Sequence, residues 1–151
     1  MRTIPKTAWM LGYAGLIPFA ILTLALLFGF DLPFLPGARL DWWLATYAAI
    51  VLSFLGAVYW GIVLVTPRLS ERETTIALLY GVAPGVIAWF AFMLPVRGAL
   101  VVMGILIMLT YVADAFLLFP RLDSEYAKLR LHLSVAVLVM LFAVAVGGTQ
   151  T

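Results

Sequence analysis

The sequence predicts an all-α integral membrane protein, a single bundle of five membrane-spanning helices. Of the 151 residues, 66% are hydrophobic and 11% are charged, whereas a soluble domain carries about 45–50% apolar and about 25% charged residues. The apolar residues also form long runs between charged or Pro/Gly-rich breaks. This composition excludes a soluble globular enzyme, and it excludes a disordered chain because disorder needs low hydrophobicity and high charge.

Five apolar runs are long enough to cross a membrane, which takes about 20 residues. They lie at residues 7–30, 42–65, 74–94, 98–119 and 131–148. The runs are continuous rather than alternating, which excludes the strands of a membrane β-barrel. Because the loops between them are short, residues 1–151 are expected to form one membrane domain.

The basic residues predict the orientation of the bundle. Seven Lys or Arg residues lie on the side of the N-terminus, and two, Arg39 and Arg97, lie on the other side. Short loops rich in Lys and Arg stay in the cytoplasm or matrix. The N-terminus is therefore expected on that side and the C-terminus outside. Since the basic residues follow this rule and are interleaved with acids, they do not indicate nucleic-acid binding.

Small residues at a spacing of four predict the helix-packing faces. Membrane helices associate where small side chains let their backbones approach closely. Two spans carry such a series, expected either to form the tightest contacts of the bundle or to bind a partner. The members are Ala45, Ala49, Ser53, Ala57 and Gly61 in the second span, and Ala77, Gly81 and Gly85 in the third. The pattern leaves open whether the partner is another span or a second copy.

Two further local signals concern helix geometry. Pro18 and Pro84 fall inside the first and third spans, where each removes a backbone hydrogen bond and is expected to kink its helix. Ser70 and Glu73 match the Ser-x-x-Glu capping box, which predicts a helix start directly before the third span.

Asp114 is the one charged residue that falls inside a predicted span. A carboxylate at the centre of a membrane helix costs about 2.5–3.5 kcal/mol on the insertion scale, so such residues mark functional sites by default. Arg130 and His132 lie at the start of the fifth span, on the same side as Asp114, and either is expected to pair with it. The pair has two interpretations, a structural link between the fourth and fifth spans or a ligand or proton site.

Aromatic side chains share this half of the membrane with Asp114. They favour either an interfacial aromatic belt or a pocket for a flat, largely apolar ligand held by a few polar groups. The candidate ligand-binding residues are Asp114, Tyr111, Tyr59, Trp60, Tyr80, Tyr13, His132 and Arg130.

Motifs for catalysis, metal binding and cofactor binding are missing from the sequence. With no Cys and a single His, a transition-metal site is not expected. No phosphate loop, no Gly-x-Ser-x-Gly and no His-Glu-x-x-His occurs. We therefore expect no enzyme, no catalytic residue and no cofactor.

Several segments together resemble the transmembrane protein 69-like family of small inner-membrane proteins. They are residues 11–19 (LGYAGLIPF), 52–61 (LSFLGAVYWG), 84–89 (PGVIAW), 129–133 (LRLHL) and Asp114. The resemblance covers nearly the whole chain. It implies a five-helix protein of the bacterial or mitochondrial inner membrane, with a link to the respiratory membrane, and it implies no particular reaction.

Two functions remain open from the sequence. The first is a non-catalytic accessory or assembly protein that binds a larger membrane complex, with the respiratory chain as one such complex. The alternative is a binder or carrier of a small apolar ligand in the pocket around Asp114. Expected partners are membrane lipid with either a membrane-protein complex, a second copy or that ligand.

Overall fold

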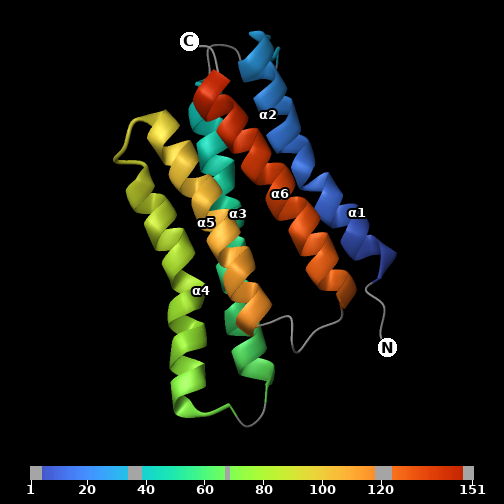
Figure 1. Ribbon diagram of the computed structural model, residues 1–151, viewed down its shortest axis with the longest axis vertical. Helices are drawn as coiled ribbons and strands as arrows, with labels where there is room; N and C mark the ends of the chain where they lie inside the picture. Colours follow the sequence, from blue (N-terminus) through green and yellow to red (C-terminus); the bar gives the residue numbers. More distant parts are fainter. Residues whose placement is uncertain (1–4, 34–38, 67–68, 118–123, 148–151) are drawn as a thin grey trace.

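The computed structural model describes residues 5–33, 39–66, 69–117 and 124–147. Within these ranges the chain is helical, and the helices run up and down in alternation (Figure 1). Their bounds are α1 Lys6–Ala14, α2 Leu16–Phe28, α3 Leu40–Val65, α4 Glu71–Ala91, α5 Val96–Leu117 and α6 Ser124–Gly147. Because α1 and α2 together make one crossing, the described residues hold five stretches long and apolar enough to span a membrane. The predicted five-helix membrane fold is confirmed.

The bundle has α3, α5 and α6 at its centre and α4 and α1/α2 at its two edges. α4 packs on α3 and α5, whereas α2 packs on α3 and α6 (Figure 1). The apolar core fills the half of the bundle that holds the starts of α3 and α5 and the ends of α2 and α6. Its largest fully buried apolar side chains are Phe19, Leu44, Leu52, Leu100, Met103, Ile107 and Leu141. The opposite half is less apolar and contains the polar side chains described below.

The first crossing is interrupted at Gly15, as the position of Pro18 predicts. Pro18 has no N–H to donate to the carbonyl four residues earlier, and α1 ends at Ala14 while α2 begins at Leu16. Tyr47 of α3 donates its hydroxyl to the Gly15 carbonyl oxygen at 3.1 Å. A side chain of a neighbouring helix thus bonds to the backbone at the break, as membrane helices require. By contrast, α4 continues through Pro84.

Each of the five crossings starts before the residue that hydropathy predicts, and the difference is largest for α4 and α6. α4 begins at Glu71 rather than at residue 74 because Ser70 and Glu73 form the expected capping box, with Glu73 N donating to Ser70 Oγ at 3.2 Å and Ser70 N to Glu73 Oε2 at 3.0 Å. α6 begins at Ser124 rather than at residue 131. Its first two turns carry charged residues, so they do not register as apolar, yet Leu129 and Arg130 are buried there.

Candidate functional site

A buried ion pair joins α5 to α6. Arg130 Nε donates to Asp114 Oδ2 at 3.0 Å, and each side chain is only 6% exposed. Asp114 lies near the end of α5 and Arg130 near the start of α6, so the antiparallel packing of these two helices brings them to one level (Figure 1). Of the two partners expected for Asp114, the structure selects Arg130.

Tyr59 adds α3 to the pair. Its hydroxyl donates to Asp114 Oδ1 at 2.5 Å, and the tyrosine is 4% exposed. Hydrogen bonds to an ionised carboxylate are shorter and about twice as strong as neutral ones. Both carboxylate oxygens of Asp114 therefore have a partner inside the bundle, one from α6 and one from α3.

The guanidinium of Arg130 has two further partners. Nη1 donates to Ser134 Oγ at 2.6 Å, and Nη2 donates to Thr110 Oγ1 at 3.1 Å. The Thr110 hydroxyl in turn donates a hydrogen bond to the Ile107 carbonyl oxygen at 2.8 Å. A buried cation costs several kcal/mol unless its N–H groups find acceptors as well as a counter-ion, and Arg130 has both.

Tyr80 connects α4 to the residues around the ion pair. Its hydroxyl donates to the Thr110 carbonyl oxygen at 3.3 Å, and its ring meets the ring of Tyr59 edge-on, with centroids 4.8 Å apart. We call Tyr59, Tyr80, Thr110, Asp114, Arg130 and Ser134 the polar cluster. It links α3, α4, α5 and α6 in the half of the bundle opposite the apolar core.

The eight residues predicted for a ligand site separate into groups. Asp114, Arg130, Tyr59 and Tyr80 belong to the polar cluster. Tyr13 and His132 instead contact each other, with Tyr13 Oη 3.2 Å from His132 Nδ1, on the exposed side of α1 and α6. Trp60 is 46% exposed on α3, and Tyr111 is half-buried on α5.

Thr110 and Ser134 are members of the cluster that sequence reasoning missed. Each lies four residues from a charged member, Thr110 before Asp114 and Ser134 after Arg130. This spacing places them on the same helix faces as the ion pair. A search for hydroxyls one turn away from the intramembrane charges would have found both.

The closest approach of α3 and α4 occurs at glycines. A Cβ placed on Gly56 would lie 2.1 Å from the Gly81 carbonyl oxygen, and one on Gly85 would lie 2.7 Å from Ser53 Oγ. Gly81 and Gly85 belong to the predicted series in the third span. Gly56 does not belong to the series predicted for the second span, although it lies three residues after Ser53.

The five-residue series of α3 does not follow one face. A step of four residues turns an α-helix by about 400°, so a series at this spacing drifts by about 40° per step. Ala45 is accordingly buried and Ala49 half-buried, whereas Ser53, Ala57 and Gly61 are exposed. In α4, Ala77 is half-buried. The series therefore begins inside the bundle and ends on its lipid-facing surface.

Over the described ranges, no group of three or more His, Cys, Asp or Glu residues lies close enough to hold a metal ion. The contacts within the polar cluster neutralise its two charges and bond one helix to another. Each charge is bonded to groups of the same chain, and the hydroxyls around them complete the network.

Comparisons with known proteins agree with the membrane fold. The model of a family described as "Protein of unknown function (DUF3429)" matches residues 4–146. The chain is 33% identical over 140 residues to transmembrane protein 69 of Xenopus tropicalis, which covers 89% of this chain and 52% of that protein. The chain thus spans about half the length of this curated relative. No solved structure matches the chain. The resemblance found in the sequence is confirmed, and the chain belongs to the DUF3429 family, with a transmembrane protein 69-like sequence.

Proposed function

We propose that this membrane protein is a non-catalytic accessory or assembly protein, which binds a larger complex of an inner membrane. The observation that carries the proposal is the polar cluster. Asp114 and Arg130 are each bonded on several sides by residues of the chain itself. A ligand near Asp114 would have to displace these bonds, so the ligand-binding alternative has less support than binding through the outer surface.

The exposed end of the small-residue series is the surface we assign to the partner. We call Ala57 and Gly61 the outer α3 face. Both are exposed, and a Cβ on Gly61 would meet nothing within 4 Å. Ser53, one turn before Ala57, does not belong to this face because its side chain lies against Gly85 of α4. A small-xxx-small series of this kind lets a second helix approach closely. We commit to a membrane helix of another protein as the occupant.

Site-specific photo-cross-linking in native membranes tests this assignment. A benzophenone amino acid at Leu64, which is 81% exposed and lies three residues after Gly61, is expected to give one discrete adduct with a protein other than a second copy. Adding Ala57→Leu should reduce the yield of that adduct at least ten-fold, because leucine holds the partner helix away. The matched control is Ala115→Leu on α5, since Ala115 is also exposed. It should leave the yield unchanged.

Three results would overturn the assignment. The first is the absence of a discrete adduct in membranes that contain the folded protein, and the second is an adduct that survives Ala57→Leu. The third is an adduct of twice the mass of the chain, which would mean that the face binds a second copy instead of another protein.

We further propose that the membrane is the inner membrane of a bacterium or a mitochondrion, with the N-terminus in the cytoplasm or matrix. The alternation of the helices supports this orientation, since Lys6, Arg72 and Lys128 lie at the starts of α1, α4 and α6. Arg39 and Arg97 lie at the opposite side, next to the starts of α3 and α5. Basic residues favour the cytoplasmic side.

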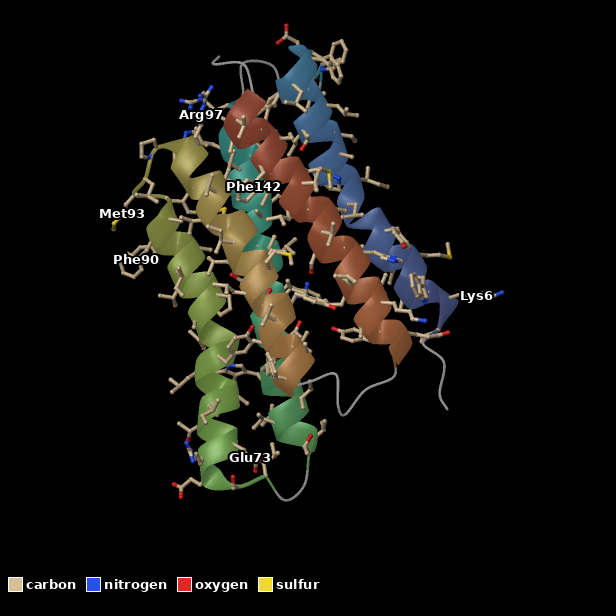
Figure 2. All side chains as sticks on the ribbon, viewed as in Figure 1. Lys6, Glu73, Phe90, Met93, Arg97 and Phe142 are labelled. Carbon is tan, nitrogen blue, oxygen red and sulfur yellow. The ribbon has the colours of Figure 1, made fainter. Side chains whose placement is uncertain are left out.

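Single cysteines test the orientation, because the natural chain has no Cys. In intact cells, an impermeant maleimide is expected to label Arg97→Cys and to leave Lys6→Cys unlabelled until the membrane is opened (Figure 2). Both positions are exposed. Labelling of Lys6→Cys alone in intact cells would mean the opposite orientation.

A further inference from the structure

The starts of α1 and α6 lie side by side and carry a second group of polar and aromatic side chains, separate from the polar cluster (Figure 1). Besides the contact between Tyr13 and His132, the ring of Trp9 stacks on that of Tyr13, with centroids 6.0 Å apart. It also lies 6.4 Å from the imidazole of His132. These contacts hold three rings together across the junction of the two helices.

Two lysines flank these rings. Lys6 lies three residues before Trp9, and Lys128 lies four residues before His132, spacings that place each lysine on the face of its neighbour. Both lysines are exposed, and Lys6 points away from the bundle (Figure 2). Glu125 lies on the same face of α6, one turn nearer the helix start, and the two lysines outweigh it by one charge. We call Lys6, Trp9, Tyr13, Lys128 and His132 the α1/α6 seam.

Exposed aliphatic side chains continue the seam toward the middle of the membrane. Ile17, four residues after Tyr13, is 56% exposed, and Val135, three residues after His132, is 42% exposed. From the helix starts inward, the surface therefore changes from lysine to aromatic and imidazole rings and then to aliphatic groups. A phospholipid changes in the same order, from charged headgroup through the polar ester region to acyl chain.

We propose that the α1/α6 seam binds an anionic phospholipid. The two lysines attract its phosphodiester, and one acyl chain lies along Ile17 and Val135. When Tyr13 donates to Nδ1 of His132, the proton of the neutral imidazole is on Nε2, which then donates to a phosphate oxygen. Within the described part of the chain, Nε2 makes no hydrogen bond. The site is independent of the outer α3 face, so the two proposals fail separately.

Native mass spectrometry of the purified protein in detergent tests the site, with phosphatidylglycerol and phosphatidylcholine of identical acyl chains as probes. Phosphatidylglycerol is expected to bind at least ten-fold more tightly. The attraction of one lysine to an anionic lipid raises the affinity about five-fold, so Lys6→Gln with Lys128→Gln should weaken phosphatidylglycerol binding by about 25-fold. Inorganic phosphate added in excess should not displace the lipid, because it has no acyl chain to bind Ile17 and Val135.

Arg72→Gln is the matched control, since Arg72 is exposed at the start of α4, on the same side of the membrane and away from the seam. It should leave phosphatidylglycerol binding unchanged. Equal binding of the two lipids would overturn the proposal. An equal loss of phosphatidylglycerol binding in Arg72→Gln and in the double lysine variant would also overturn it. Such a result would mean that all the basic residues on this side of the membrane attract the lipid equally. Displacement by inorganic phosphate would identify a free-phosphate site instead.

Discussion

Replacing Asp114 by alanine is expected to lower the free energy of unfolding by about 3–5 kcal/mol, because it leaves Arg130 buried without its counter-ion. The guanidinium is held inside the bundle by α5 and α6, with a side chain only 6% exposed, and cannot reach water without opening their contact. The Tyr59 hydroxyl loses its acceptor at the same time. Unfolding with sodium dodecyl sulfate in mixed micelles, followed by circular dichroism, measures the change.

The control for Asp114→Ala is an ion pair at the surface. Arg39 Nη2 lies 2.7 Å from Asp41 Oδ2, with side chains 56% and 16% exposed. Arg39→Ala should leave the free energy of unfolding nearly unchanged, since exposed pairs are screened by water. If Asp114→Ala were equally harmless, the polar cluster would not stabilise the bundle.

An apolar version of the cluster should recover the stability that Asp114→Ala loses. Asp114→Leu with Arg130→Met and Tyr59→Phe removes both charges and the Tyr59 hydroxyl that bonds to Asp114. Replacing a buried ion pair by apolar residues of similar volume is often neutral or stabilising. We expect the triple variant to unfold within about 1 kcal/mol of the natural protein. A loss as large as that of Asp114→Ala would contradict this.

Gly56→Ala is expected to lower the free energy of unfolding by about 3 kcal/mol, at the upper end of the range for overpacking. The added Cβ would lie 2.1 Å from the Gly81 carbonyl oxygen. Because the obstacle is backbone rather than a flexible side chain, α3 and α4 must separate to make room. The same unfolding assay measures the loss.

Gly61→Ala is the matched control on the same helix. A Cβ there would meet nothing within 4 Å, and alanine stabilises a helix interior by about 0.5–1 kcal/mol relative to glycine. The two substitutions should therefore change the stability in opposite directions. Equal changes in the free energy of unfolding would show that the close approach of α3 to α4 does not require a glycine at position 56.

Much of the fold follows from local sequence signals. Apolar run length predicts the five crossings, Pro18 predicts the break between α1 and α2, and Ser70 with Glu73 predicts the start of α4. These signals are local because each depends on a helix's own backbone or on its transfer into lipid. Apolar run length alone does not reach the start of α6 at Ser124, since the first turns of this helix carry charged residues.

The candidate site was predicted in part. An intramembrane acid needs a partner, and Arg130 was one of two candidates at the right depth. The choice between Arg130 and His132 depends on how α6 is rotated against α5, which the sequence of one helix does not specify. Gly56 was missed for a related reason, because a spacing of exactly four residues drifts around the helix while the true contact follows the 3.6-residue turn.

The most direct test of the central claim combines the triple apolar variant with the photo-cross-linker at Leu64. The claim is that the polar cluster holds the helices together while the outer α3 face binds the partner. The account predicts that the folded triple variant gives the same cross-linked partner, in the same yield, as the natural chain. A folded triple variant that has lost the adduct would contradict it, and would show that Asp114, Arg130 and Tyr59 take part in function directly.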